Sequence, residues 1–256
     1  MDTSTVLYEE QDRVGRVTLN RPGRANALSR QMIAELTACL RRAGEARTAR
    51  VLILRGAGPH FCAGHDLGEL QARPAEARLV FEECSRMMLL LQELPQPVIA
   101  QVHGTATAAG CQLVAACDLA VAEEGARFAT PGVKIGLFCS TPMVALSRAV
   151  GRKRALEMLF TGEFANAADA LAMGLVNRVV PRDRLAEETG RLAERIAASS
   201  LLTLEIGKRA FYQQVNLPDE AAYRYAETVM AMNAGLEVAR EGIAAFLEKR
   251  PPVWPE

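Results

Sequence analysis

The stretch from Gln101 to Cys117 combines a turn of small residues with the start of a helix, a pattern that could hold a negatively charged oxygen. The apolar run at 97–102 predicts a buried strand, and small residues at 105–110 let a ligand approach the backbone closely. The helix expected at 109–116 begins with N–H groups that lack partners inside the helix, and its dipole favours negative charge there. The pattern therefore indicates an oxyanion site, although a turn needed only for packing would look the same.

Composition excludes several classes of protein. The chain has 256 residues with 50% hydrophobic and 23% charged residues, which is ordinary for a globular protein with ample core. Lys+Arg and Asp+Glu are both 30, so there is no basic field of the kind that nucleic-acid binding needs. No apolar run approaches the length of a membrane span, and we expect no membrane insertion.

Cysteine usage and the first residues bear on the compartment. The six cysteines (39, 62, 84, 111, 117 and 139) form no C-x-x-C pair, and a chain of this length needs no disulfides. The N-terminus Met1-Asp2-Thr3-Ser4-Thr5 has neither a signal-peptide core nor an Arg-rich transit pattern. We therefore expect reduced thiols and a cytoplasmic protein. Three histidines without clustered ligands indicate no metal site.

The elements that would position the oxyanion site alternate between strands and helices. Apolar runs predict strands at 6–10, 14–19, 51–54, 97–102, 119–122 and 176–180, with 128–133 extended but broken by Pro131-Gly132. Apolar periodicity predicts helices at 30–45, 76–94, 109–116, 143–150, 152–161, 167–173, 185–199, 204–214 and 221–232, helical almost to 247. The order of these elements indicates an α/β fold followed by a helical end, and the tail 250–255 cannot be helical.

Several motifs in order resemble the enoyl-CoA hydratase/isomerase (crotonase) superfamily. They include R-P-G-R-A-N-A-L at 21–28, F-C-A-G-H-D-L at 61–67, P-V-I-A-Q-V-H-G at 97–104 and A-A-G-C-Q-L-V-A-A-C-D at 108–118. Further matches are F-A-T-P-G-V-K-I-G-L at 128–137, L-F-T-G-E at 159–163, A-M-G-L-V-N-R-V-V-P at 172–181 and E-G-I-A-A-F-L-E-K-R at 241–250. Within the superfamily, the chain is most similar to the mitochondrial enoyl-CoA hydratase domain-containing proteins that lack both hydratase glutamates.

The resemblance implies a crotonase-type (ClpP/crotonase-like) spiral of strand–strand–helix units with a C-terminal helical trimerisation region. It divides the chain into an acyl-CoA-binding core at 1–184 and an oligomerisation region at 185–256, with a homotrimer or a dimer of trimers as the assembly. It also implies a coenzyme A thioester as substrate or ligand, with no other cofactor. The thioester oxygen would lie between the backbone N–H groups of His65 and Ala109, and removing one such donor typically costs ~10²–10³ in rate.

The same resemblance carries over the residues that would contact the ligand. They are Arg24, Ala25, Ala63, His65, Asp66, Leu67, Gly110, Cys139 and Lys249.

Two positions depart from the pattern of the hydratases. The two glutamates that activate water and supply a proton in those enzymes fall on Gln112 and Gly132. Gln112 can orient a water molecule but cannot take its proton, and Gly132 has no side chain. A positioned acid or base is usually worth ~10²–10⁴ in rate, so the sequence predicts a very poor hydratase.

No other residue is an obvious replacement for these glutamates. The pKa range of histidine would suit His65 for acid–base work, unless its ring turns to solvent or bonds to the loop. Cys139 and Ser140 lack an adjacent activating base and fit a role in lining a pocket. Cys62 and Cys111 fit buried, inert thiols. Asp66 fits a helix cap and Asp118 an ordering role in the next strand, while Lys249 binds CoA phosphates or is simply solvated.

Two functions therefore remain open, and the sequence does not decide whether the chain is an enzyme. The first is an acyl-CoA enzyme that uses the oxyanion site without the two-glutamate mechanism. The second is a non-catalytic acyl-CoA binder or regulator of fatty-acid metabolism. RNA binding is disfavoured by the zero net charge and by the lack of basic patches with aromatic residues.

Overall fold

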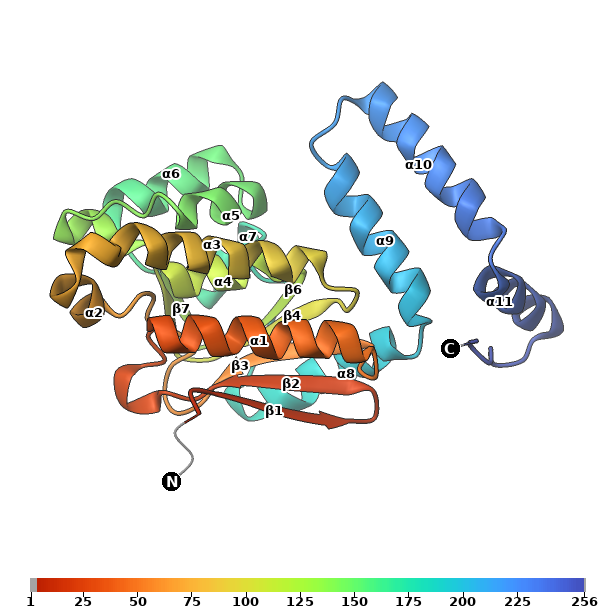
Figure 1. Ribbon diagram of the computed structural model, residues 1–256, viewed down its shortest axis with the longest axis horizontal. Helices are drawn as coiled ribbons and strands as arrows, with labels where there is room; N and C mark the ends of the chain where they lie inside the picture. Colours follow the sequence, from red (N-terminus) through yellow and green to blue (C-terminus); the bar gives the residue numbers. More distant parts are fainter. Residues whose placement is uncertain (1–3, 256) are drawn as a thin grey trace.

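A mostly parallel six-stranded sheet organises the chain, as a computed structural model that describes residues 4–255 shows (Figure 1). The sheet order is β1-β2-β3-β4-β6-β9, in which β1 alone runs antiparallel to its neighbour. A smaller sheet has the order β5-β7-β8. The strands are β1 Val6–Gln11, β2 Val14–Leu19, β3 Val51–Gly56, β4 Val98–Val102, β5 Thr105–Thr107, β6 Leu119–Glu123, β7 Arg127–Ala129, β8 Ala165–Asn166 and β9 Arg178–Val180.

Helices follow the strands and cover both faces of the large sheet. The α-helices are α1 Arg30–Ala46, α2 Leu67–Ala72, α3 Ala77–Glu93, α4 Ala109–Ala116, α5 Pro142–Ala149, α6 Arg152–Thr161, α7 Ala167–Ala172, α8 Leu185–Ala197, α9 Leu201–Gln214, α10 Asp219–Ala234 and α11 Glu237–Glu248. Short 3₁₀ helices are η1 Pro22–Arg24, η2 Pro74–Glu76, η3 Pro131–Ile135 and η4 Arg182–Arg184. The α/β prediction is confirmed.

The central strands are buried on both sides, because helices pack on each face. The first four residues of β3 are buried, as a parallel strand between two helical layers requires. On one face β3 meets the main core beneath α1, α3 and α4, and on the other it meets a smaller cluster with α8. α1 starts where the sequence predicts, with the Ser29 hydroxyl accepting a hydrogen bond from the Met32 N–H at 3.2 Å.

The last helices extend away from the sheet (Figure 1). A buried lysine, Lys208 of α9, donates hydrogen bonds to the Leu91 and Gln96 carbonyls at 2.6 and 2.9 Å and to Asp118 at 2.7 Å. Asp118 also accepts the Val98 N–H at 2.7 Å. Asp118 therefore orders the start of β4 and attaches α9 to the core, whereas the sequence suggested a role at the following strand.

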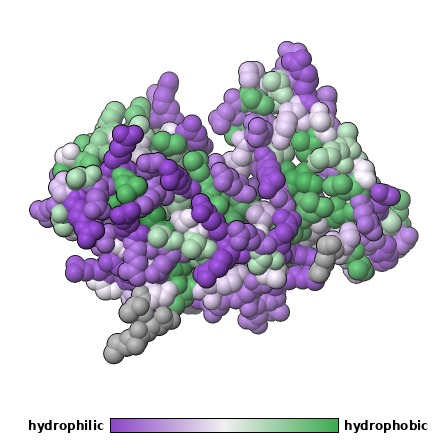
Figure 2. Space-filling model, viewed as in Figure 1, coloured by the Kyte–Doolittle hydropathy of each residue, from purple (hydrophilic) through white to green (hydrophobic). Residues whose placement is uncertain are grey.

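The boundary proposed at residue 184 stays a prediction. α8 follows that boundary in the chain and packs on the large sheet, with Leu185, Ala193 and Ala197 in the buried cluster. The tail that follows α11 contacts the end of α8, where the Trp254 indole N–H donates to the Ala198 carbonyl at 2.7 Å. Figure 2 shows apolar residues gathered over α9–α11.

The break predicted at Pro131-Gly132 within the segment 128–133 is confirmed, but the residues after the break are not extended. β7 ends at Ala129 and the chain turns into the 3₁₀ helix η3. Pro131 at the first turn fixes a helical φ, which explains the change. This turn shapes the site described below. The tail at 250–255 is not helical, as predicted. No helix among residues 4–255 is long and apolar enough to cross a membrane.

Candidate active site

Two loop segments lie side by side at the carboxyl ends of β3 and β4. The Cys62 N–H donates to the Thr105 carbonyl at 3.1 Å, and the Thr107 N–H donates back to the Cys62 carbonyl at 3.0 Å. A Cβ on Gly110 would lie 2.1 Å from the Cys62 carbonyl oxygen, and one on Gly64 would lie 2.9 Å from the Thr107 oxygen. The segments approach this closely because neither glycine has a side chain.

The backbone around His65 pairs with Leu28 on one side, and the His65 N–H points to the opposite side. The Gly64 carbonyl accepts the Leu28 N–H at 2.7 Å, and the Asp66 N–H donates to the Leu28 carbonyl at 3.1 Å. Peptide groups alternate direction along an extended chain, so the His65 N–H between them faces the opposite side.

The Ala109 amide is the first of helix α4. The preceding Ala108 has φ 49° and ψ −116°, and its N–H donates to the Ala129 carbonyl at 2.9 Å. Within residues 4–255, neither the His65 nor the Ala109 N–H donates a hydrogen bond to the protein. Gly64 brings the two segments together, since a Cβ there would lie 3.2 Å from the Ala109 nitrogen. The two donors are thus available to a ligand oxygen, which is an arrangement that suits a developing oxyanion.

A largely apolar cavity of about 370 Å³ adjoins these segments. Its walls are Ala63, His65, Leu67, Phe81, Ala108, Pro131, Gly132, Lys134, Ile135, Leu137, Phe138, Cys139, Ser140, Thr141 and Pro142. The volume falls within the range of ~300–1,000 Å³ that is usual for small-molecule sites. Five residues expected from the sequence therefore line one cavity, namely Ala63, His65, Leu67, Gly132 and Cys139.

The ring of His65 is largely buried and packs edge-to-face on Phe81, with ring centroids 5.1 Å apart. Burial lowers the pKa of His65 to about 4, so the imidazole is neutral at physiological pH. Its Nε2 atom is buried and has no hydrogen-bond partner among the described residues. The ring therefore does not turn to solvent, and its low pKa makes it a weak base.

Gln112 and Gly132, the positions onto which the resemblance maps the two hydratase glutamates, are placed differently from each other. Gln112 is buried and lines a separate cavity of about 810 Å³ bounded by α3, α4, α5 and α9. Its Oε1 atom has no partner within the described part of the chain. Thr141 lines both cavities, so the two meet at the start of α5.

Gly132 has no room for a side chain. A Cβ there would lie 2.0 Å from the Leu137 carbonyl oxygen and 2.8 Å from the Cys139 sulfur. The Leu137 N–H donates to the Gly132 carbonyl at 3.0 Å, which closes a tight turn. An acid at this position would require a different loop, so its absence is part of the local fold.

The surroundings of the cysteines near the site make their thiols unreactive. Burial raises the pKa of Cys62 and Cys111 to about 12 and also raises that of Cys139. All three remain protonated at neutral pH, and a thiol is a far weaker nucleophile than a thiolate. Ser140 is exposed, and its hydroxyl contacts only the Phe138 carbonyl at 3.4 Å.

A polar cavity of about 480 Å³ lies beyond the apolar one, lined by Arg24 and Asp66 among others. Asp66 caps α2 by accepting the Gly68 and Glu69 N–H groups at 3.1 and 3.4 Å, as expected. Burial alone would raise the Asp66 pKa, but the hydrogen bond from Arg21 at 3.1 Å and the cap lower it overall. Asp66 is therefore an ionised structural group.

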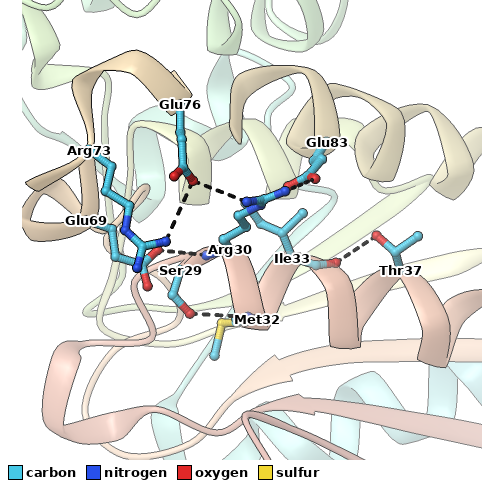
Figure 3. A network of polar contacts seen from close by, with 9 residues as sticks. All are labelled: Ser29, Arg30, Met32, Ile33, Thr37, Glu69, Arg73, Glu76 and Glu83. Carbon is cyan, nitrogen blue, oxygen red and sulfur yellow. Dashed lines mark hydrogen bonds and ion pairs between the residues drawn. The ribbon is translucent and has the colours of Figure 1, made fainter. Parts of the chain in front are cut away.

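The short helices beside this polar cavity are held to α1 by Arg30 (Figure 3). The Arg30 backbone N–H donates to Glu69 at 2.9 Å, and its guanidinium meets Glu83 at 2.9 Å and Glu76 at 3.2 Å. These contacts link α1 to α2, η2 and α3, which carry Leu67 and Phe81 of the apolar cavity.

Three of the predicted ligand contacts line neither the apolar nor the polar cavity. Ala25 is in the left-handed conformation, and its carbonyl accepts the Ala63 N–H at 3.0 Å, so it supports the wall from behind. Gly110 supports Ala109 through its contact with Cys62. Lys249 ends α11, at the opposite end of the molecule from α2 (Figure 1), so within one chain the structure does not bring it to the site.

Sequence reasoning missed several residues that shape the site, including the two aromatic ones. Phe81, Lys134 and Phe138 line the apolar cavity. Asn26 is fully buried, accepts the Arg21 N–H at 2.9 Å and donates to the Ala57 and His60 carbonyls at 2.9 and 2.8 Å. Only Asn26 offered a signal, because it stands in the R-P-G-R-A-N-A-L motif among residues that prefer turns.

Comparison with known proteins gives a consistent set of relatives. The family model described as "Enoyl-CoA hydratase/isomerase" matches residues 9–256. The mouse (Mus musculus) "Enoyl-CoA hydratase domain-containing protein 3, mitochondrial" is 47% identical over 248 residues, covering 96% of this chain and 82% of the relative.

Two solved structures superpose almost completely on this chain. An enoyl-CoA hydratase from Mycobacterium smegmatis has a TM-score of 0.95 at 49% identity, covering 98% of this chain and 99% of the other. The human enoyl coenzyme A hydratase domain-containing protein 3 has a TM-score of 0.95 at 45% identity, covering 98% and 100%. The predicted crotonase fold is confirmed.

The predicted cytoplasmic location is contradicted by this comparison. The mouse, rat, frog, zebrafish and human relatives are all named mitochondrial. The prediction was wrong because reduced thiols indicate a reducing environment without saying which one. The composition of Met1–Thr5 was no better guide, and residues 1–3 lie outside the described structure.

Proposed function

Since the chain belongs to the enoyl-CoA hydratase/isomerase family, we propose that it binds an acyl-CoA thioester with the His65 and Ala109 N–H groups on the thioester oxygen. The free direction of these two amides beside an apolar cavity carries the proposal. Backbone donors stabilise the negative charge that a thioester oxygen gains when the neighbouring carbon loses a proton. The acyl group would occupy the cavity that Phe81 and Phe138 help to line.

The two-glutamate hydration is not part of this proposal. The cavity has no carboxylate among its lining residues, and Gly132 lacks the space to carry one. The Gln112 amide cannot accept a proton from water, and its Oε1 atom is buried without a partner among the described residues. Hydration at the rate of an ordinary family member would therefore need an acid and a base that the cavity wall does not supply.

A non-catalytic binder is the second candidate, and the protonation states of the cavity favour it. The pKa of His65 lies far below neutral and that of Cys139 is raised. Neither group is therefore a good base at pH 7. Such a protein would sequester acyl-CoA or report its level in fatty-acid metabolism.

Self-association is part of the proposal as well. Large apolar side chains on α10 and α11 are highly exposed in one chain, including Phe246 at 81%, Leu247 at 73% and Tyr223 at 71%. Exposed apolar surface of this kind marks interaction sites. A trimer or a dimer of trimers would cover it, and light scattering would give the number of subunits.

A proton-exchange experiment separates the enzyme from the binder. The protein is titrated with butanoyl-, hexanoyl- and crotonyl-CoA in D₂O, and binding, mass change and deuterium at the carbon next to the thioester are followed. Exchange above the buffer rate supports the enzyme, and binding without exchange or mass change supports the binder. The proposal is overturned if none of these thioesters binds.

Gln112→Glu is the informative variant in this experiment. It adds one carboxylate at the position where hydratases hold water, while Gly132 still provides no proton donor. We expect at most a slight gain in hydration of crotonyl-CoA. If the unmodified protein already hydrates crotonyl-CoA at a turnover ordinary for enzymes, roughly 10 s⁻¹ or above, the assignment of Gln112 and Gly132 is wrong.

A further inference from the structure

A buried carboxylate lies behind the oxyanion arrangement, at the corner where the chain leaves the large sheet. Glu123 is the last residue of β6, which runs beside β4 (Figure 1). Its side chain is 3% exposed, and its Oε1 atom accepts the Gly104 N–H at 2.8 Å. Glu123 does not line the apolar cavity, so any effect on a ligand there must pass through Gly104.

Gly104 forms the corner between β4 of the large sheet and β5 of the small one. Its φ is 57°, a conformation that glycine adopts without strain. A Cβ there would lie 2.0 Å from the Pro59 carbonyl oxygen, so the corner lies directly against the segment that leads to His65. The Gly104 carbonyl accepts the Arg127 N–H at 2.8 Å. Gly104 is therefore held at both its N–H and its carbonyl.

The residues on either side of Gly104 bind the facing segment. The His103 carbonyl accepts the Phe61 N–H at 3.1 Å, and the Thr105 carbonyl accepts the Cys62 N–H at 3.1 Å. Each proposed oxyanion donor lies a few residues further along one of these two segments. A change of direction at Gly104 would therefore alter the distance between the donors, and a displacement of about 1 Å in such an arrangement can cost about 10²-fold in rate.

Stability alone does not explain a carboxylate at this place. The Glu123 Oε2 atom is buried and makes no hydrogen bond among the described residues. Its ion-pair partner, Arg182 at 3.6 Å, has a side chain that is 74% exposed. Burying a charge with such incomplete pairing is unfavourable. A hydrogen bond from an N–H to a carboxylate is, however, shorter and stronger than one between neutral groups, so the carboxylate holds the Gly104 N–H firmly.

We propose that Glu123 is a positioning residue for the oxyanion arrangement, because its carboxylate fixes the corner at Gly104 and thereby the spacing of the two N–H donors. This inference rests on the proposed function, in which the His65 and Ala109 N–H groups hold a thioester oxygen. Glu123 contacts neither the ligand nor the donors. Its effect is therefore on how strongly the bound carbonyl is polarised, more than on whether the ligand binds.

The test is isotope-edited infrared spectroscopy of bound hexanoyl-CoA that carries ¹³C at the thioester carbonyl. In the unmodified protein, two N–H donors should lower the carbonyl stretching frequency relative to the free thioester. Glu123→Ala removes the acceptor of the Gly104 N–H and should lose most of that shift. Its dissociation constant for hexanoyl-CoA should rise by only about 2–10-fold, as expected for one weakened hydrogen bond.

Three further variants keep the test decisive. Glu123→Gln is the conservative change, since its amide oxygen can accept the same N–H, and it should keep most of the shift. Glu123→Asp keeps the charge but shortens the side chain, so it should behave like Glu123→Ala. This pair also covers the case in which Glu123→Ala does not fold. Arg182→Ala is the matched control, because it removes the ion pair but leaves the Gly104 hydrogen bond, and it should retain the full shift.

The outcomes separate this inference from the proposed function. If Glu123→Ala or Glu123→Asp binds hexanoyl-CoA with the full shift, or if Glu123→Gln loses it, the inference is overturned while the thioester site stands. A loss of stability in urea without a change in the shift has the same meaning, since it would show a purely structural role. If the unmodified protein binds hexanoyl-CoA without any shift, or does not bind it, the proposed function itself fails.

Discussion

Replacing Gly132 by alanine should destabilise the protein for a purely steric reason. The added Cβ would lie 2.0 Å from the Leu137 carbonyl oxygen and 2.8 Å from the Cys139 sulfur, whereas favourable carbon contacts lie near ~3.5–4.0 Å. The turn closed by the Leu137 N–H at 3.0 Å must therefore open. Overpacking costs about 1–3 kcal/mol, and losing the turn's hydrogen bond adds about 1 kcal/mol. The expected loss is about 2–4 kcal/mol.

Urea unfolding of the two proteins at one concentration measures this loss, since an oligomer's stability depends on concentration. Gly190→Ala is the matched control, because nothing lies within 4 Å of a Cβ built there and the residue is inside helix α8. Alanine is better than glycine in a helix by about 0.8–1 kcal/mol, so the control should gain stability. If Gly132→Ala matches the unmodified protein to within about 0.5 kcal/mol, the turn accepts a side chain. The argument against an acid at 132 then fails.

Three other substitutions test contacts that hold the fold and the site. Lys208→Met leaves Asp118 without its cation and should lower the free energy of unfolding in urea by about 3–5 kcal/mol. The double variant Lys208→Met/Asp118→Asn should recover part of that loss. An unchanged urea midpoint for Lys208→Met would contradict the role of this pair. Asn26→Ala leaves the Ala57 and His60 carbonyls and the Arg21 N–H unpaired, so it should lower stability by about 2–4 kcal/mol and weaken acyl-CoA binding; intact binding would mean that the loop keeps its shape unaided. The pKa of His65 lies at about 4 against an unfolded value near ~6.5, so the unfolded chain binds the extra proton between these values. The free energy of unfolding should then fall by up to roughly 1.4 kcal/mol per pH unit as the pH drops from about 6.5 to 4. His65→Phe should reduce this slope. If the ring is solvated, the slope will be absent.

Local patterns in the sequence were enough to predict the layers of the fold. Apolar runs such as that of β3 and capped periodic segments such as α1 behave as expected, because burial and hydrogen bonding act on neighbours in the chain. The break at Pro131-Gly132 was predicted, but the 3₁₀ helix η3 that begins there was not. The short strands β5 and β8 were missed as well, since so few residues have no periodicity to detect.

The site was predicted in part. Motifs identified the segments around His65 and Ala109, and the chain pairing of Cys62 with Thr105 and Thr107 brings them together. No pattern in the sequence could show that Gln112 lines a different cavity from His65, because that depends on how α4 packs on α5. Nor could it show the orphaned Nε2 atom of His65, which results from contacts between distant residues.

The contact between Gly110 and Cys62 bears on which positions of this fold can be substituted. The donors of the proposed oxyanion arrangement are main-chain atoms, and Gly64 and Gly110 allow the two loops that carry them to touch because they have no side chain. Any side chain that lines the cavity can then be exchanged without removing the two N–H donors. A side chain at Gly64 or Gly110, by contrast, should abolish the arrangement. Side chains around such a centre can therefore be changed, whereas a side chain at Gly64 or Gly110 would collide with the facing loop.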